Sequence, residues 1–339
     1  FNNMNYYYYS FFILLVFFLI FISKKFNLFL DQKKDNHKKF VNPKNNYFLG
    51  GIILFLFILS ISINKEQYFD LIFISSIFLL GILSDLKVLN DPKKRFILQG
   101  IIIFLFVFLL EIKIPSTRLE LFDFYLQNSF INSIFVVFCL MILINGSNFI
   151  DGLNTLLILN KILILLIFIL FFSNNLIFDY NNYEFLFVLL FLLALNALGL
   201  IILGDSGAYV ISLIFGISLI NFANQNYFIS PYFIILLIWY PCFELLYSII
   251  RRITSNKKSY NPDKKHLHQL LYLIIAKKNK LDFKLNHLIT SFLINSYNFL
   301  ILFLGINFIY QTKILIIIIF LNIIIYLLIY NLLTKKIKN

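Results

Sequence analysis

Residues 130–172 of this 339-residue chain read FINSIFVVFCLMILINGSNFIDGLNTLLILNKILILLIFILFF. Two apolar runs, 130–144 and 155–172, flank a short turn that holds most of the polar side chains of the stretch. A helix needs about 20 apolar residues to cross the hydrocarbon core of a bilayer, whereas about 10 to 14 are typical of a buried helix in a soluble protein. The stretch therefore predicts two helices that cross a membrane and meet at a polar turn.

The same alternation of long apolar runs and short polar segments extends through the whole chain. Hydrophobic residues make up 60% of the sequence and charged residues 13%, whereas soluble domains carry about 25% charged residues. This composition excludes an ordinary soluble enzyme and a disordered chain. It predicts an all-α, polytopic transmembrane helical bundle that forms one integral membrane domain over residues 1–339. About 11 spans are expected, at residues 6–22, 47–63, 69–83, 96–110, 130–144, 155–172, 185–203, 208–222, 230–250, 288–309 and 314–333.

Positive charge is divided unequally between the two sets of loops. The loops after odd-numbered spans, together with the C-terminal tail, carry 24 Lys and Arg residues, and the opposite loops carry four. Lys and Arg accumulate in the cytoplasmic loops of membrane proteins. We therefore expect the N-terminus outside, the C-terminus in the cytoplasm, and the long basic loop 251–287 on the cytoplasmic side.

Glycine, proline and histidine are rare in this chain and gather at the predicted cytoplasmic loops. Seven of the 11 Gly, four of the 6 Pro and all 4 His lie at or near these loops. Residues that merely filled loops would be spread over both faces, so their distribution predicts one working face at the inner leaflet. Nearly all acidic residues lie at span ends or in loops, which argues against a transporter or channel with ionisable groups in mid-span.

Asp85 follows closely on the apolar run 69–83. A carboxylate that is buried without a partner carries a large desolvation cost. Its side chain is therefore either solvated or paired with a cation or a metal ion, and this residue alone does not decide between the two.

Three polar residues, Asn145, Asn148 and Asp151, follow one another at intervals of three in the turn between two apolar runs. In a helical turn this spacing brings side chains onto one face. Amide and carboxylate oxygens suit a hard cation such as Mg²⁺, and they also suit a polar head group. A plain polar turn is the alternative interpretation.

The run 208–222 is preceded by the short sequence Gly204-Asp205-Ser206-Gly207. A helix that begins here would present free backbone N–H groups, which attract anions such as phosphate. The acid could hold Mg²⁺ against the same phosphates.

The basic loop contains His266 and His268 among Lys and Arg residues. No nearby set of Cys and His residues completes a zinc site, so contact with phosphate groups is the better interpretation. Histidines beside a basic membrane anchor are the alternative. Taken together, the loops favour Mg²⁺ bound to a nucleotide diphosphate, because phosphoryl transfer depends chiefly on positioning and charge neutralisation. A phosphoryl-transfer site within a membrane implies a lipid as the second substrate.

These motifs resemble those of the polyprenyl-phosphate N-acetylhexosamine-1-phosphate transferases, which are family-4 glycosyltransferases. The resemblance runs from Asp31 to about Leu271. It rests on five motifs in the family order: Gly50-Gly51, the segment from Gly81 to Gln99, Asn-x-x-Asn-Phe-x-Asp-Gly at 145–152, Gly-Asp-Ser-Gly at 204–207, and Pro-Asp-x-x-His-x-His at 262–268. The last motif, which follows Arg251-Arg252, looks closest to the undecaprenyl-phosphate GlcNAc-1-phosphate transferase branch.

The resemblance implies transfer of a sugar 1-phosphate from a UDP-sugar to a lipid phosphate, with release of UMP. It implies catalytic roles for four residues. Asp85 would lie beside the lipid phosphate, and Asp151 would belong to the nucleotide or metal pocket. His266 and His268 would contact the diphosphate.

The resemblance also implies a bound metal ion and a set of binding residues. Asp205 and Asn148 would hold Mg²⁺, with Mn²⁺ as a substitute ion. The expected substrate-binding residues are Asn145, Lys44, Arg252, Asp263 and Lys264.

The expected partners are a UDP-N-acetylhexosamine, a polyprenyl phosphate lipid and the membrane itself, with no nucleic acid; a homodimer is left open. The resemblance places the protein in the bacterial inner membrane with a cytoplasmic active face, at the first membrane step of a lipopolysaccharide or other cell-surface polysaccharide. The alternatives are a peptidoglycan-type translocase of the same fold, an inactive relative and a membrane transporter.

Two positions depart from the family pattern. Ser84 stands where the family usually has the first of two adjacent acids, which has been proposed as the base that deprotonates the lipid phosphate. The second pKa of a phosphate monoester is about 6, so the lipid phosphate is mostly ionised at neutral pH without a base. Gln269 stands where a third His is common; it can form hydrogen bonds but carries no charge.

Overall fold

The computed structural model describes residues 3–30, 47–64, 68–172, 182–255, 265–278 and 282–338. Within these ranges the regular structure is helical, in fourteen helices. The helices are α1 Asn3–Phe26, α2 Gly50–Asn64, α3 Tyr68–Asp85, α4 Pro92–Leu109, α5 Glu120–Leu126, α6 Ser129–Ile150, α7 Leu156–Phe171, α8 Asn182–Ala197, α9 Gly204–Gln225, α10 Pro231–Leu237, α11 Trp239–Thr254, α12 Leu267–Lys278, α13 Phe283–Ile306 and α14 Thr312–Lys338.

Each predicted span falls on one helix, except that the run 230–250 is divided between α10 and α11. Among the described residues, five helices are long and apolar enough to cross a membrane: α1 from Tyr9, α6, α9, α13 and α14. A sixth span results if α10 and α11, which are bent by 78° at their junction, are counted as one. The all-helical membrane fold is thus confirmed, whereas the count of eleven spans and the orientation of the termini remain predictions.

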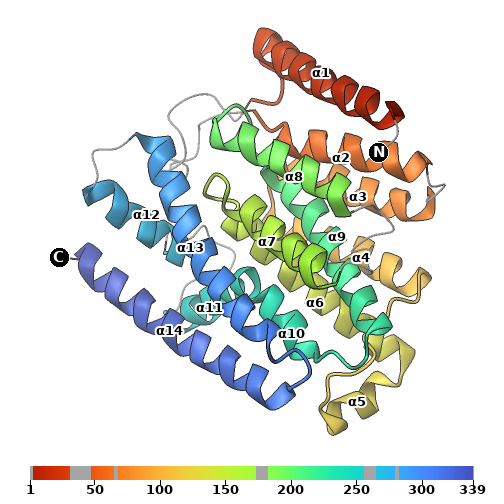
Figure 1. The fold of residues 1–339 in the computed structure, drawn as a ribbon, viewed down its shortest axis with the longest axis vertical. Coiled ribbons are helices and arrows are strands. Elements are labelled where there is room, and N and C mark those ends of the chain that lie inside the picture. Colours follow the sequence, from red (N-terminus) through yellow and green to blue (C-terminus); the bar gives the residue numbers. More distant parts are fainter. Residues whose placement is uncertain are drawn as a thin grey trace.

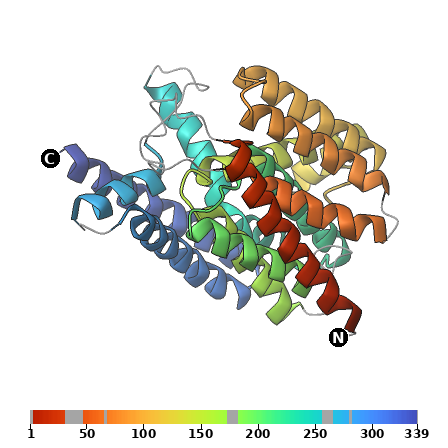
Figure 2. The ribbon, with the colours of Figure 1, turned by 90° about the horizontal axis from the view of Figure 1, so that it is seen from above.

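The bundle surrounds α9. Of the apolar window in α9, 83% is buried, against 22% in α1 and 17% in α14. Figures 1 and 2 show α13 and α14 on one side, α2 to α4 on the other, and α6, α7 and α9 between them. Sequence periodicity could not rank the helices in this way, because a membrane helix is apolar on its lipid-facing side as well as its buried side.

Close contact between helices brings the end of α3 to the beginning of α9. At Gly81, an added Cβ would meet the backbone of Ser206, including its nitrogen at 2.7 Å. At Gly51, an added Cβ would meet the side chain of the same serine. The backbones lie so close together here that only glycine fits. At these two positions, the glycines that predicted a working face in the sequence therefore mark the crossing of helices.

The predicted loop 251–287 contains regular structure of its own. Helix α11 extends to Thr254, α12 occupies Leu267–Lys278, and α13 begins at Phe283. The described part of this segment is thus mainly helical, and the two histidines of the His-x-His motif lie at the beginning of α12.

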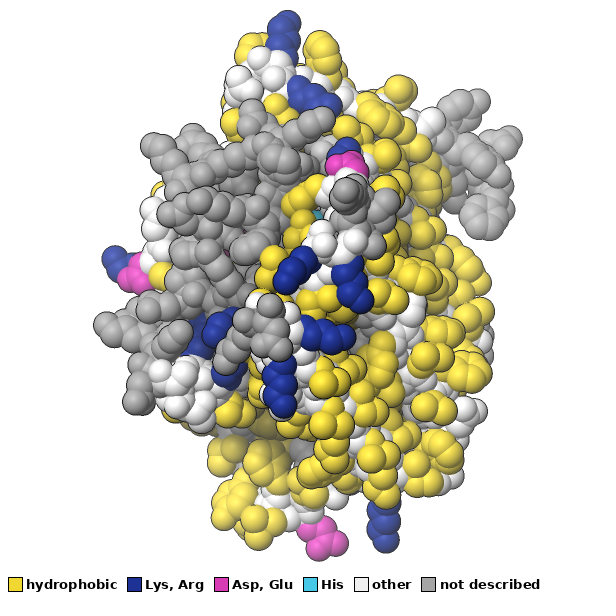
Figure 3. Space-filling model, turned by 90° about the vertical axis from the view of Figure 1, so that its left-hand side faces the viewer, with side chains coloured by type: hydrophobic (Ala, Val, Ile, Leu, Met, Phe, Trp, Pro, Cys, Tyr) yellow, Lys and Arg dark blue, Asp and Glu magenta, His cyan; other side chains and the backbone are white. Residues whose placement is uncertain are grey.

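Lysine and arginine side chains gather on one end of the bundle. Figure 3, which views the left-hand side of Figure 1, shows them across this face among hydrophobic side chains. The first turn of α4 carries exposed Lys93 and Lys94, and the last turn of α12 carries exposed Lys277 and Lys278. This end also holds the C-terminus of α3 and the N-terminus of α9.

The glycine contact gives a prediction about stability. Gly81→Ala should lower the melting temperature of the purified protein in detergent, because overpacking against a backbone costs about 1–3 kcal/mol. Gly100→Ala is the control, since its Cβ would meet only the terminal methyl of Met141 at 3.9 Å. That substitution should be neutral or stabilising, because alanine has the higher helix propensity. Equal melting temperatures for the two variants would contradict the close crossing.

Candidate active site

The carboxylate of Asp85 binds the beginning of α9. Its Oδ1 accepts a hydrogen bond from the backbone N–H of Asp205 at 2.8 Å. Its Oδ2 accepts from the N–H of Ser206 at 3.1 Å and from the Ser206 hydroxyl at 2.7 Å. The first N–H groups of a helix have no partner within the helix, so Asp85 supplies one. This arrangement answers the question left by the sequence: Asp85 is paired with hydrogen-bond donors of α9.

Burial, together with the nearby charge of Asp205, raises the pKa of Asp85 to about 7. Two carboxyl groups at one place repel each other when both are ionised. Simultaneous ionisation of the two acids is therefore disfavoured, and a cation placed between or beside them would favour it.

Asp205 forms an ion pair that sequence reasoning did not assign. Its Oδ2 accepts a hydrogen bond from Nη1 of Arg95 at 2.8 Å and another from the hydroxyl of Ser84. Arg95 also donates to the oxygen of Ser84. Ser84 thus joins a polar triangle with a carboxylate and a guanidinium. The signal in the sequence was the position of Arg95 in the same motif as Asp85, the segment from Gly81 to Gln99, but no role was predicted for it.

Asp85 and Asp205 together form a cluster of acids that could hold a divalent cation. Mg²⁺ favours carboxylate oxygens and retains several waters, and Asp85 and Asp205 provide hard oxygens whose mutual repulsion a cation would relieve. Asn148, the other predicted metal ligand, is half-buried on α6. The described part of the chain contains no group of three or more His, Cys, Asp or Glu residues arranged to hold a metal.

Asn145 connects α6 to α4. Its Nδ2 donates to Oε1 of Gln99 at 2.9 Å and to the carbonyl of Met141 at the same distance. The amide nitrogen is thus bonded within the protein. Gln99 is buried, so the bond fixes the end of α6 next to the helix that carries Arg95.

Asp151 lies at the C-terminus of α6, where the chain turns into α7. Its backbone N–H donates to the carbonyl of Ser147 at 3.1 Å. The turn that follows is fixed by two residues missed in the sequence. Nδ1 of His287 accepts from the N–H of Asn154 at 3.1 Å, and the Asn196 side chain accepts from the N–H of Thr155 at 2.6 Å.

The two histidines of the His-x-His motif lie side by side. Their rings are parallel, within 7°, with centroids 5.5 Å apart. The ring of Phe149, from the end of α6, lies 5.1 Å from that of His266, and the guanidinium of Arg252 lies 6.0 Å from the same phenylalanine. Helix α6 therefore stands between the two clusters, with Asn145 toward α4 and Phe149 toward the histidines.

His268 differs from the expectation of a cationic phosphate contact. It is fully buried, and burial lowers its pKa to about 3, so it is neutral at physiological pH. Its Nδ1 lies 3.5 Å from the hydroxyl of Tyr240. Its Nε2 has no hydrogen-bond partner among the described residues and lies 3.7 Å from an ideal Cβ on Gly152.

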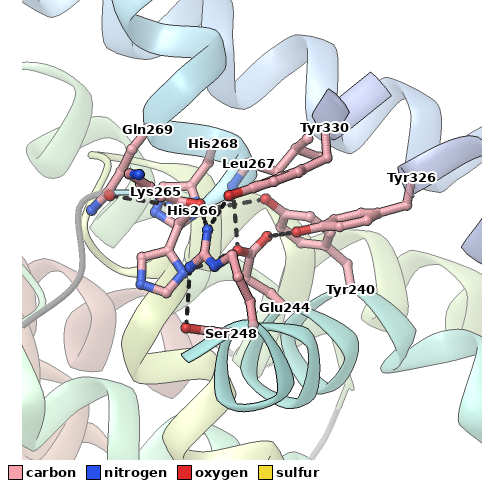
Figure 4. A network of polar contacts seen from close by, with 11 residues as sticks. Tyr240, Glu244, Ser248, Lys265, His266, Leu267, His268, Gln269, Tyr326 and Tyr330 are labelled. Atoms are coloured by element: carbon pink, nitrogen blue, oxygen red, sulfur yellow. Dashed lines mark hydrogen bonds and ion pairs between the residues drawn. The ribbon is translucent and has the colours of Figure 1, made fainter. Parts of the chain in front are cut away.

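Figure 4 shows that His266 contacts Glu244, a buried acid of α11. The sequence signal for Glu244 was an acid within an apolar run of a chain that has few acids. Three predicted binding residues, Lys44, Asp263 and Lys264, lie outside the described residues.

The sequence of this region is similar to one known family of proteins. Residues 69–223 match the family model described as Glycosyl transferase family 4. The matched region runs from α3 into α9 and includes both acids, Arg95 and the Asn145–Asp151 turn, but ends before Glu244 and the histidines. No curated protein matches the chain. The match supports a glycosyltransferase of family 4, that is, a membrane-associated transferase of the phospho-sugar type.

The paired acids predict a response to divalent cations. MgCl₂ should raise the melting temperature of the detergent-purified protein more at about pH 8 than at about pH 5, because Asp85, whose pKa is raised to about 7, is ionised mainly at the higher pH. Without Mg²⁺, the free energy of unfolding should fall as the pH rises from about 5 to about 8. The raised pKa makes the native state bind a proton at Asp85 more tightly than the unfolded state does, and this advantage is lost when the proton leaves.

Asp205→Asn removes one of the two charges, so this variant should lose most of the Mg²⁺-dependent rise. NaCl at equal ionic strength is the control for general screening. A rise of equal size in Asp205→Asn would remove this residue from the metal site.

Proposed function

We propose that the protein transfers an N-acetylhexosamine 1-phosphate from a UDP-sugar to a polyprenyl phosphate and releases UMP. The observation that carries the proposal is the contact of Asp85 and Asp205 at the beginning of α9, with Arg95 beside them. The match of residues 69–223 to family-4 glycosyltransferases supports the same class of reaction.

The proposed reaction exchanges one phosphorus–oxygen bond for another. An oxygen of the lipid phosphate forms a bond to the phosphorus that carries the sugar. The bond from that phosphorus to the bridging oxygen breaks, and UMP leaves with this oxygen and the electron pair. The product is a polyprenyl diphosphate sugar. Such a transfer depends on alignment and on neutralisation of charge, more than on covalent chemistry by the protein.

The residues of the acid cluster have separate tasks in this proposal. Asp85 holds the beginning of α9 and thereby positions the side chain of Asp205. Arg95 contributes a fixed positive charge, which a planar guanidinium can share between a carboxylate and a phosphate. Mg²⁺ would be held by Asp205, with Asn148 as the ligand that the family resemblance implies and Asp85 as the neighbouring acid. When bound, the ion would neutralise phosphate charge.

Ser84 takes part without acting as a base. Its hydroxyl contacts both Asp205 and Arg95, so it orients the ion pair. The lipid phosphate has a second pKa of about 6 and is mostly dianionic at neutral pH. Its oxygen is therefore already a nucleophile, and the missing acid need not remove a proton.

An apolar cavity supports a lipid substrate. It has a volume of about 370 Å³ and lies between α6, α9, α10 and the segment 114–122. Its lining extends from Leu143, two residues before Asn145, to Ala223 near the far end of α9 from Asp205. A cavity lined mainly by carbon suits an isoprenoid chain better than a sugar.

The proposed setting is the bacterial inner membrane, with the basic end of the bundle in the cytoplasm and a role in cell-surface polysaccharide synthesis of the O-antigen type. A peptidoglycan-type translocase would use the same fold. A membrane transporter is the other alternative, and Lys161 is the cation within the run 155–172. Its Nζ lies 5.3 Å from the centroid of the Phe215 ring in the packed interior, so this lysine gives little support to a transport pathway.

The function is tested by UMP release from a panel of UDP-N-acetylhexosamines with polyprenyl phosphate. We expect Mg²⁺-dependent release for at least one donor. Inside-out membrane vesicles should use UDP-sugar added from outside, whereas right-side-out vesicles should not, since the donor cannot cross the bilayer. Absence of release with every donor would refute the proposed activity, and equal release from both vesicle types would refute the cytoplasmic site.

A second prediction concerns Ser84. Activity should fall below about pH 6, where the lipid phosphate takes up its second proton. Ser84→Asp supplies an acid and should flatten this decline or raise turnover modestly. Asp85→Asn should be far more damaging than Ser84→Ala, because an amide cannot accept all three hydrogen bonds from α9. If the natural protein is inactive at every pH while Ser84→Asp is active, the chain is an inactive relative.

A further inference from the structure

Glu244 is a buried acid with every hydrogen bond supplied by the protein. Its side chain is 1% exposed on α11. Its Oε1 lies 3.0 Å from Nδ1 of His266 and accepts from the N–H of Leu267 at 3.2 Å. Its Oε2 accepts from the hydroxyl of Tyr326 at 2.8 Å (Figure 4). A buried carboxylate without such partners would be strongly destabilising, so this arrangement is a built network.

The contact with Glu244 determines which ring nitrogen of His266 carries the hydrogen. An ionised carboxylate only accepts hydrogen bonds, so Nδ1 of His266 must carry its hydrogen. The other nitrogen, Nε2, is then the atom left for a ligand, as an acceptor in the neutral ring and a donor in the charged one. Glu244 thereby fixes both the tautomer and the direction of the ring.

Glu244 also anchors the helix that carries the histidines. Leu267 is the first residue of α12, and its N–H is one of the donors that the helix itself cannot satisfy. A negative charge at this end also interacts favourably with the helix dipole. The position of His266 thus depends on Glu244 through both the side chain and the backbone.

The last helix of the chain completes the network. Tyr326 of α14 is 1% exposed, and its hydroxyl holds the second oxygen of Glu244. One turn further on, Tyr330 accepts a hydrogen bond from Arg251, which also donates to the carbonyl of Lys265. Helix α14 therefore contacts the two residues of α11, Glu244 and Arg251, that bond to the segment just before α12. All these residues lie beyond the region 69–223 that matches the family model.

We propose that Glu244 and Tyr326 are positioning residues, which hold His266 with Nδ1 toward Glu244 and Nε2 toward the diphosphate of the donor. This inference rests on the proposed function for the identity of the ligand. Helix α14 then supports the reaction centre through Tyr326.

A matched pair of tyrosine variants separates positioning from stability. Tyr326→Phe removes the bond to Glu244. Tyr297→Phe removes a tyrosine bond to the same helix, from Tyr297 to Oδ1 of Asn322 at 2.5 Å, and leaves Glu244 untouched. We expect both variants to fold, with the larger loss of melting temperature in Tyr326→Phe, because this variant leaves an oxygen of a buried carboxylate without its donor. Of the two tyrosine variants, only Tyr326→Phe should lose turnover, by several-fold. Glu244→Gln should lose about tenfold or more, as is seen for carboxylates that orient a metal-binding histidine.

A spectroscopic measurement tests the positioning without activity. In protein labelled with ¹⁵N-histidine, the Nδ1 proton of His266 should give a strongly downfield resonance, assigned by its loss in His266→Gln. The resonance should persist in Tyr297→Phe, move upfield in Tyr326→Phe and disappear in Glu244→Gln.

The two readouts distinguish the two ways of failing. An unchanged resonance in Glu244→Gln, or equal losses of turnover in the two tyrosine variants, would overturn the positioning role. The expected pattern of resonances in a protein that releases no UMP from any donor would support the positioning of His266 and refute the proposed function.

Discussion

The contact between the Asp85 carboxylate and the first N–H groups of α9 governs the arrangement of the site. In an apolar bundle there is little water to satisfy the unpaired N–H groups at a helix start, so a side chain must do so. The carboxylate of Asp85 accepts hydrogen bonds from the N–H groups of Asp205 and Ser206 at 2.8 and 3.1 Å. The contact is reached only because glycine allows α3 and α9 to touch at Gly81. The same contact holds a second acid, Asp205, beside the first, and the two carboxylates repel each other when both are ionised.

Charge at the site is balanced unevenly on the two sides of α6. On one side, two carboxylates face a single guanidinium, which leaves net negative charge suited to a divalent cation. On the other side, one carboxylate, Glu244, faces His266 and the hydroxyl of Tyr326. The side chains of Asn145 and Phe149 connect the end of α6 to these two clusters. A ligand with both a metal-binding diphosphate and further polar groups would span this helix end.

Sequence patterns located the helices and most of the candidate site. The apolar runs fell on helices, and the motif residues Asp85, Asp205 and Asn145 lie in or next to the acid cluster. The charge of His268 was misjudged, because spacing in a motif says nothing about burial, and burial lowers the pKa of this histidine. Arg95 and Glu244 were seen in the sequence but given no role, because their partners are 110 and 22 residues away along the chain.

The sequence by itself determined that the chain is an all-helical protein with long apolar segments, and it predicted a polar site at the helix ends, since hydropathy and the placement of rare residues are local properties. Only the tertiary structure decided which donors and acceptors meet. Asp85 binds the start of α9, Asp205 pairs with Arg95, and Glu244 links His266 to the last helix. These contacts depend on how closely and at which level the helices cross. In this chain nearly every helix is apolar on all sides, so periodicity cannot specify the crossings, and packing between glycines and backbones does.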